Sequence, residues 1–243
     1  MNIYAISDLH LSFCSTPDPP DWYVREYKPM SEIDRGWTDH ARKIFNNWVR
    51  VVKEGDIVLL PGDISWAMKL EEAEPDIYYL GMLPGRIVAV QGNHDYWWQS
   101  ISRVRSKMPP NVSLIQNDCV FFEGLAICGT RGWLCPNSSF FGEKDEKIYR
   151  RELIRLENSL KNAGGKAEKT IGIMHFMPTN EKKEYSGFIE LFRDYGVDTV
   201  VYGHLHSRAC QHRLPDSNWG INFHLVSADF LDFSPVHIGS WSR

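Results

Sequence analysis

The chain has 243 residues, of which 43% are hydrophobic and 24% are charged, and its formal net charge is −4. A chain of this length and composition can bury a sizeable core, and we expect one domain over residues 1–243. The negative charge, with no long run of Lys and Arg, argues against nucleic-acid binding. No apolar run approaches the roughly 20 residues that a membrane helix needs. A strand that begins almost at Met1 leaves no room for a signal peptide, so we expect a cytoplasmic protein.

Strands and helices alternate along most of the chain. Short apolar runs rich in β-branched residues predict strands at 3–7, 57–61, 86–90, 170–174, 199–202, 221–227 and 236–238. Apolar residues at three- and four-residue steps, with Gly and Pro near the ends, predict helices at 39–53, 75–83, 96–107, 143–162 and 187–195. Short runs at 112–115, 119–122 and 125–128 predict an antiparallel meander, with turns at 117–118 and 123–124. The pattern predicts an α/β fold.

Residues 11–36 are rich in proline, which predicts a long irregular loop. Aromatic residues such as Trp22, Tyr23 and Tyr27 are interleaved with these prolines. Two interpretations remain open. The loop either folds over the mouth of a site and contacts substrate, or is pinned to the surface by its aromatic side chains.

Five of the predicted strands end in residues that bind metals or move protons. These residues are Asp8 and His10, Asp63, Asn93 with His94 and Asp95, His175, and His204 with His206. Ligands of open α/β sheets collect at the carboxyl ends of the strands, so we expect these side chains to lie together. Their carboxylate, amide and imidazole groups, without thiolate, suit Mn, Fe or Zn better than Ca or Mg.

The motifs Asp8-x-His10, Gly62-Asp63, Gly92-Asn93-His94-Asp95, His175 and Gly203-His204-x-His206 together resemble the calcineurin-like metallophosphoesterases. The resemblance spans residues 8–206. It implies two mixed β-sheets packed as a sandwich and flanked by helices. It also implies a ligand set: one metal bound by Asp8, His10 and His206, the other by Asn93, His175 and His204, and Asp63 bridging the two. The spacing of His204 and His206 fits an extended segment, because residues two apart then point the same way.

His94 follows the expected ligand Asn93 directly, so we expect it to face the substrate and to stabilise the phosphoryl group or protonate the leaving oxygen. Asp95 is a second candidate catalytic residue, which either orients His94 or holds its loop. In the Ser/Thr protein phosphatase branch, an Asp three residues after the bridging Asp supports this His, and an Arg follows. Trp66 and Ala67 stand at those positions here, which argues against phosphoprotein hydrolysis.

Arg131 is the candidate substrate-binding cation outside the motifs, since it leaves a predicted strand between two glycines. A salt bridge is the alternative role. Several aromatic residues lie close in sequence to the motif ends: Trp66, Tyr96, Trp97, Trp98 and Trp133. They either form a stacking wall for a nucleoside or aryl group or belong to the core.

These observations favour a dinuclear metal-dependent phosphoesterase. It would hydrolyse a small-molecule phosphate mono- or diester through a metal-bridging hydroxide. The choice between monoester and diester, the native metal pair and the oligomeric state stay open. Two alternative functions are a non-catalytic scaffold that kept the fold for protein binding and a Mn-dependent nuclease. The complete ligand set argues against the scaffold, and the acidic balance argues against the nuclease.

Overall fold

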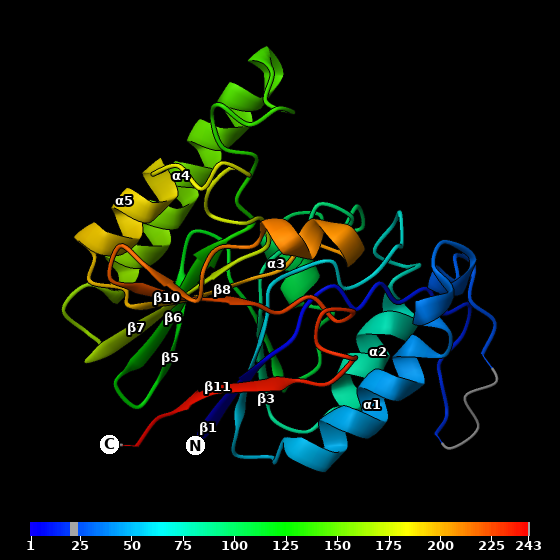
Figure 1. Ribbon diagram of the computed structural model, residues 1–243. Coiled ribbons are helices and arrows are strands. Elements are labelled where there is room, and N and C mark those ends of the chain that lie inside the picture. The colour runs from blue at the N-terminus through cyan, green and yellow to red at the C-terminus, as the bar shows by residue number, and fades with distance from the viewer. Residues whose placement is uncertain (20–23, 243) are drawn as a thin grey trace.

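The computed structural model describes residues 1–19 and 24–242 of the chain (Figure 1). A first mixed sheet contains β1 (Asn2–Ala5), β2 (Ile57–Leu60), β3 (Arg86–Ala89), β4 (Val112–Leu114) and β11 (Val236–Ser240). The strand order is β11-β1-β2-β3-β4. Strands β1 to β4 are parallel, and β11 pairs antiparallel with β1, which brings the two ends of the chain close together.

A second mixed sheet contains β5 (Cys119–Phe122), β6 (Leu125–Thr130), β7 (Lys169–Met174), β8 (Thr199–Tyr202), β9 (Ser217–Asn218) and β10 (Ile221–Leu225). The strand order is β5-β6-β7-β8-β10-β9. Its four inner strands are parallel, and the two edge strands β5 and β9 are antiparallel to their neighbours. The sequence prediction of two mixed sheets is confirmed.

The two sheets pack face to face through an apolar layer. Ile57 and Leu59 of the first sheet belong to the same buried cluster as Ile171 and Val201 of the second. Because successive side chains of a strand point to opposite faces, the alternate residues of β2 face the other way, toward helices. Both faces of the central strands are therefore buried, which explains why they are continuous apolar runs in the sequence.

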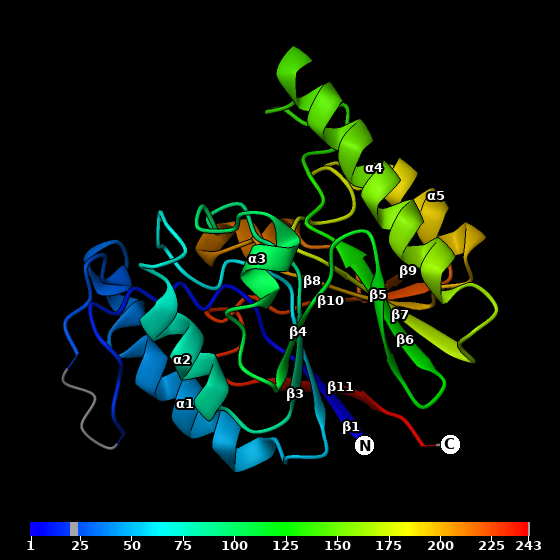
Figure 2. The ribbon, with the colours of Figure 1, turned by 180° about the vertical axis from the view of Figure 1, so that it is seen from behind.

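Helices cover the outer face of each sheet (Figures 1 and 2). The first sheet is covered by α1 (His40–Val51), α2 (Glu74–Met82) and α3 (Ile101–Arg105), and the second by α4 (Glu143–Ala163) and α5 (Gly187–Asp194). Short 3₁₀ segments are η1 (Met30–Glu32), η2 (Arg35–Trp37) and η3 (Ser207–His212). Among the described helices, none has both the length and the apolar character needed to cross a membrane.

The predicted antiparallel meander is wrong for its first strand only. β4 pairs parallel with β3 in the first sheet, whereas β5 and β6 form an antiparallel hairpin in the second sheet. The segment around Asn117 and Asp118 is therefore a crossing between sheets. The hairpin turn at Glu123 and Gly124 is as predicted, and both residues have the positive φ angles that a tight hairpin turn requires.

The predicted helix at 96–107 is wrong in its first half, since α3 covers only Ile101–Arg105. The preceding turn is held by Asp95, whose carboxylate accepts a hydrogen bond of 3.0 Å from the Trp97 indole. The side chains of Trp97 and Trp98 are both buried in the core of the first sheet and its helices. Tertiary packing of these two rings thus replaces the helical turn that local propensity favours.

The sheets meet at the carboxyl ends of their parallel strands. Ser7, just beyond β1, forms a parallel bridge with Ser227, just beyond β10. The Ser7 amide donates to the Val226 carbonyl at 2.7 Å, and the Ala228 amide donates to the Ser7 carbonyl at 3.0 Å. This bridge brings the strand ends of both sheets to one edge, where the motif residues lie.

Candidate metal centre

Several motif residues adopt backbone conformations that ordinary strand ends do not. Asp8, His10, Asp63 and His204 all have φ angles between 47° and 71°, in the left-handed region. Non-glycine residues are strained in this region, and residues strained in this way cluster at functional sites. Backbone bonds over-determine the geometry: the amides of Asp8 and His10 donate to the carbonyls of Gly62 and Asp63, each at 3.0 Å. The expectation of an extended segment at His204–His206 is wrong at His204, whose φ is 71°, whereas His206 is extended.

Gly92 is required by close approach. A Cβ at this position would lie 2.0 Å from Asp63 Oδ1 and 2.1 Å from the Asp63 amide nitrogen. Neither atom can move without displacing Asp63, since the His94 amide also donates to Asp63 Oδ1 at 2.8 Å. The absence of a side chain at Gly92 therefore lets two strand ends touch and sets the position of Asp63.

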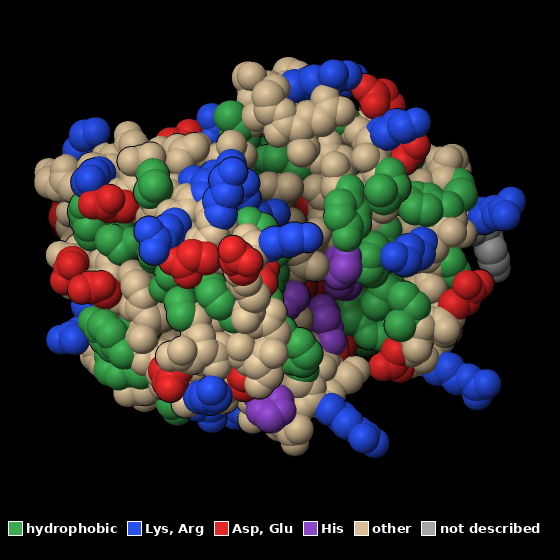
Figure 3. Space-filling model, turned by 90° about the horizontal axis from the view of Figure 1, so that it is seen from above, with side chains coloured by type: hydrophobic (Ala, Val, Ile, Leu, Met, Phe, Trp, Pro, Cys, Tyr) green, Lys and Arg blue, Asp and Glu red, His purple; other side chains and the backbone are tan. Residues whose placement is uncertain are grey.

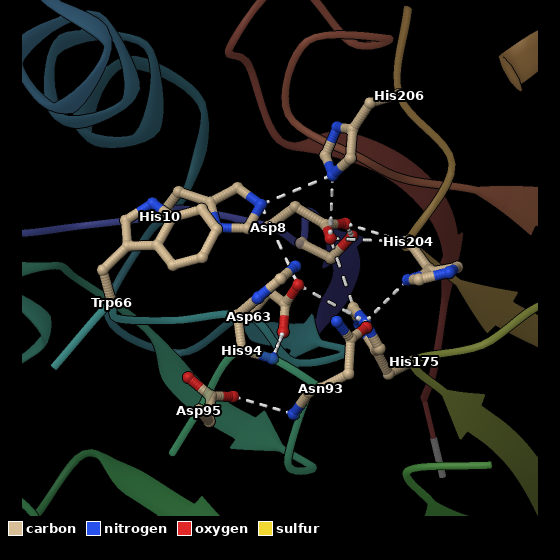
Figure 4. A network of polar contacts seen from close by, with 12 residues as sticks. Asp8, His10, Asp63, Trp66, Asn93, His94, Asp95, His175, His204 and His206 are labelled. Carbon is tan, nitrogen blue, oxygen red and sulfur yellow. Dashed lines mark hydrogen bonds and ion pairs between the residues drawn. The ribbon is translucent and has the colours of Figure 1, made fainter. Parts of the chain in front are cut away.

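A first cluster of donor atoms consists of Asp8, His10 and His206 (Figure 4). His206 Nε2 lies 3.3 Å from Asp8 Oδ1 and 3.4 Å from His10 Nε2. Asp8 and His10 are almost fully buried, whereas the His206 side chain is 29% exposed. Amides of the chain fix Asp8 further, because the His204 amide donates to both its carboxylate oxygens.

A second cluster contains Asn93, His175 and His204. His175 Nε2 lies 2.6 Å from Asn93 Oδ1 and 3.2 Å from His204 Nδ1. His175 is fully buried at the end of β7. Asp63 lies between the clusters, since its Oδ2 is 3.5 Å from His175 Nε2 and 3.9 Å from His10 Nε2. The seven side chains that the sequence singled out as ligands are thus brought together (Figure 4).

The tautomer of His175 leaves the lone pair of its Nε2 facing the acceptor oxygens of Asn93 and Asp63. Its Nδ1 lies 2.9 Å from the Pro61 carbonyl oxygen, which only accepts, so Nδ1 carries the proton. Burial lowers the pKa of His175 to about 3, so the ring is neutral and Nε2 is an unprotonated acceptor. That acceptor faces oxygens of Asn93 and Asp63. Acceptors converge in this way where a cation holds them, which fits a metal.

The buried Asp8 carboxylate of the first cluster is stabilised by positive charge around it. Burial alone would raise the pKa of Asp8, but the surrounding imidazoles of His206, His175 and His10 hold it well below its usual range. Burial opposes charge on His206 as well, yet Asp8 and Asp229 raise the pKa of His206 to about 10. In the metal-free protein, a protonated His206 therefore supplies the positive charge beside Asp8 that a metal cation would otherwise supply.

His94 lies beside the two clusters without joining either. Its ring centre is 4.3 Å from that of Trp66 and 5.8 Å from that of His10. Its Nδ1 is enclosed and has no hydrogen-bond partner among residues 1–19 and 24–242. Trp66 also stacks on His10 at 4.7 Å, and the Lys28 ammonium lies 3.2 Å from the centre of the Trp66 ring. The Trp66 ring, with Lys28 on it, thus packs near His94, although the phosphatase branch has a supporting Asp at the position of Trp66.

Asp95 contacts backbone rather than His94. Its fully buried carboxylate accepts from the amides of Gly92 at 2.7 Å, Ile64 at 2.9 Å and Ser65 at 3.1 Å, besides the Trp97 indole. These bonds tie the Gly92 turn to the segment after Asp63. The contacts are those of a residue that holds a loop.

Arg131 lies at the end of β6 and its side chain is only 15% exposed. Its Nη2 is 3.6 Å from the buried Glu152 carboxylate, and its guanidinium stacks over the Trp133 ring at 4.7 Å. The Arg131 carbonyl accepts from the amides of His175 and Phe176, which fixes its backbone beside the second cluster. Among the aromatic residues, Trp97 and Trp98 are core residues, and Tyr96 is exposed.

The segment 11–36 and the residue directly after it both approach the centre. Lys28 reaches the Trp66 ring, and Trp37, directly after the segment, packs within 5.7 Å of the rings of His10 and His206. Both interpretations of the segment therefore have support in its contacts. Trp22 and Tyr23 lie outside the described residues.

The model of the calcineurin-like phosphoesterase family matches residues 1–208, which is most of the chain. The chain belongs to the calcineurin-like phosphoesterases. Members of this family are mostly hydrolases of phosphoester bonds, and they use divalent metals. Two groups of donor side chains in the described residues could hold a metal ion, one of Asp8, His10 and His206 and the other of Asp8, Asp63 and His175.

Two solved structures share the fold. A protein of unknown function from Aquifex aeolicus is 14% identical with a TM-score of 0.52, and the alignment covers 97% of this chain and 95% of that one. The phosphopantetheinyl hydrolase of Mycobacterium tuberculosis is also 14% identical with a TM-score of 0.52, over 93% of this chain and 88% of that one. No curated protein matches the chain. At this identity the likeness speaks for the fold alone.

Asp229 was missed from the sequence. Its Oδ1 lies 2.8 Å from His206 Nδ1, and its Oδ2 accepts from the Ser207 amide at 2.8 Å. The Asp229 carboxylate thereby places a proton on Nδ1 of His206 and directs Nε2 toward Asp8. The available signal was the polar residue just beyond the 221–227 strand, the same pattern that identified the other strand ends.

Asp229→Asn should lower the affinity of the His206 cluster for metal about 10–100-fold, because the charge that supports the imidazole is lost. Competition between the protein and a metal chelator measures the affinity. Asp232→Asn, at an exposed carboxylate three residues further on, is the matched control and should leave it unchanged. Equal affinities in both variants would mean that Asp229 only shapes the loop.

Proposed function

We propose that this protein is a dinuclear metal-dependent phosphoesterase acting on a small-molecule phosphate mono- or diester. The observation that carries the proposal is the convergence of carboxylate, amide and imidazole donors in two adjacent clusters, with Asp63 Oδ2 3.5 Å from His175 Nε2 and 3.9 Å from His10 Nε2. In this proposal Asp8, His10 and His206 hold one divalent ion, and Asn93, His175 and His204 hold the other. Mn, Fe and Zn suit these donors. The fold shared with a protein named as a phosphopantetheinyl hydrolase agrees with a hydrolase.

Asp63 is the proposed bridging ligand. Two cations about 3.5–4 Å apart repel each other, and a carboxylate between them reduces that repulsion. When bound, the metals would supply Lewis acidity and an activated water at neutral pH. The chain's own contribution is to fix the donors: the left-handed turns and the Gly92 contact hold Asp63 where one of its oxygens reaches both clusters.

His94 is the proposed catalytic residue. Its ring stands beside the clusters, against Trp66, and is half-buried. From there it can donate a proton to the leaving oxygen or a hydrogen bond to the phosphoryl group. We propose that the Trp66 ring orients His94 in place of a carboxylate. Asp95 would then act indirectly, by holding the Gly92 turn that carries Asn93 and His94.

Two cations are proposed to attract the substrate phosphate. Arg131 remains a candidate because its Nε is buried without a hydrogen-bond partner in the described part of the chain. The Glu152 carboxylate that pairs with Arg131 also pairs with Arg155, whose Nη1 lies 2.9 Å from Glu152 Oε1. Lys28 is the second candidate, since its ammonium lies 3.2 Å from the centre of the Trp66 ring, which also packs against His94.

The test is reconstitution with Mn²⁺, followed by metal analysis and assays with p-nitrophenyl phosphate and its bis ester. We expect two ions per chain and hydrolysis of at least one ester. Treatment with a chelator should abolish the activity, and Mn²⁺ should restore it. Fewer than two ions with no hydrolysis of either ester would reject the proposal. Cleavage of single-stranded DNA under the same conditions would favour the nuclease instead.

A further inference from the structure

A cavity of about 210 Å³ opens beside the second cluster. His204 lines it together with Phe176, and their ring centres are 4.2 Å apart. Trp133 continues this wall, with its ring centre 5.0 Å from that of Phe176. The cavity therefore begins at a proposed metal ligand and leads away from it along aromatic rings. In Figure 3 a group of histidines lies in a hollow with hydrophobic side chains beside it.

Two polar side chains that line the cavity, Asn180 and Glu181, already form hydrogen bonds within the protein. The Asn180 amide nitrogen donates to the Pro136 carbonyl at 2.9 Å and to Glu184 at 2.6 Å. The Glu181 carboxylate accepts from both the amide and the hydroxyl of Ser139, each at 2.7 Å. These bonds remove the groups that would otherwise recognise a sugar hydroxyl or a charged base. What remains for a ligand is chiefly apolar surface.

One side chain is placed at the rim in a way that folding does not explain. Phe140 lines the cavity and is 82% exposed, the most exposed of the large hydrophobic residues described. The two bonds from Ser139 to Glu181 pin the loop that carries it. An aromatic ring held in water gains free energy only when something apolar covers it.

We infer that this cavity binds the organic part of the substrate, and that this part is an apolar chain or ring attached to the phosphoryl group. The inference rests on the proposed function, because His204 belongs both to the metal cluster and to the cavity wall. At roughly 30 Å³ for a group the size of a water molecule, the cavity has room for about seven such groups. The substrate class is therefore a phosphate ester of a hydrophobic alcohol rather than of a sugar or nucleoside.

Binding of alkylphosphonates, which lack a hydrolysable ester bond, tests this inference. Calorimetric titration of the Mn²⁺-loaded protein compares methyl-, propyl-, hexyl- and 6-hydroxyhexylphosphonate. Each methylene that enters the cavity should strengthen binding about fourfold, so three buried methylenes give about 60-fold. The 6-hydroxyhexyl compound should lose most of this gain, because its hydroxyl finds no free partner.

Two variants locate the effect. Ala209→Trp fills the cavity from an exposed wall position and should abolish the gain with chain length while leaving methylphosphonate binding unchanged. Gln211→Trp, at an exposed position that does not line the cavity, is its matched control and should behave as the original protein. Phe140→Ser removes the rim and should reduce the gain for the hexyl compound. Metal content is measured for each variant, so that loss of the centre is not mistaken for loss of the cavity.

The outcomes separate the inference from the function on which it rests. Tight methylphosphonate binding with no dependence on chain length, or equal binding of the hexyl and 6-hydroxyhexyl compounds, overturns the apolar subsite alone. A chain-length gain that survives both Ala209→Trp and Phe140→Ser places the alkyl group elsewhere and also overturns it. Failure of inorganic phosphate and every phosphonate to bind would contradict the phosphoesterase proposal as well.

Discussion

His94→Asn should slow turnover about 10²–10⁴-fold and leave both metals bound. The imidazole of His94 packs on Trp66, and neither group of donor atoms in the described residues includes it. The His94 backbone amide donates to the proposed ligand Asp63 at 2.8 Å, and this bond is kept in the variant. The substitution therefore removes a proton donor without removing a ligand.

The loss should depend on the leaving group. Nitrophenolate is a stable anion and needs little protonation, so p-nitrophenyl esters should be the least affected. Alkyl esters with high-pKa leaving groups should show the full effect, measured as kcat over a series of esters. His237→Asn, at an exposed histidine on β11 that packs on Tyr4, is the control and should leave kcat unchanged. Equal slowing of good and poor leaving groups would identify His94 as a phosphoryl-positioning group, and loss of a metal would identify it as a ligand.

The strand ends were predictable because their signal is local. An apolar run followed by Asp, Asn or His needs no knowledge of distant residues, and parallel strands present their carboxyl ends at one edge of a sheet. Residues such as Asp8, Asp63 and His175 therefore lie together as the sequence indicated. The same local logic predicted strands such as β7 and β8.

The remaining features depend on contacts between distant parts of the chain. Nothing local decides that β4 joins β3 while β5 joins β6, because strand propensity does not specify the sheet. The left-handed φ of His204 follows from contacts with Asp8, 196 residues earlier in the chain. From the sequence, Trp66 shows only that the supporting Asp of the phosphatase branch is missing. In the structure, Trp66 packs against both His10 and His94.

Asp63→Asn should weaken both metals at once. An Asn keeps the size of the side chain and retains one acceptor oxygen, but it removes the negative charge between the two clusters. Loss of an outer partner of a metal ligand already costs about 10–100-fold in affinity, and loss of a bridging ligand should cost at least the upper end of that range. The effect is large because Asp63 is only 1% exposed, so water cannot screen the repulsion between two adjacent cations.

Metal content after dialysis at a fixed free Mn²⁺ concentration measures the effect, and His94→Asn is the matched comparison. The two substitutions lie within one hydrogen bond of each other, since the His94 amide donates to Asp63. Asp63→Asn should retain fewer than two ions, whereas His94→Asn should retain both. If Asp63→Asn loses one ion and binds the other with unchanged affinity, Asp63 serves a single metal. The buried Asp8 carboxylate, which lies 3.3 Å from His206 Nε2 and 3.9 Å from His175 Nδ1, would then be the carboxylate placed to span the two ions.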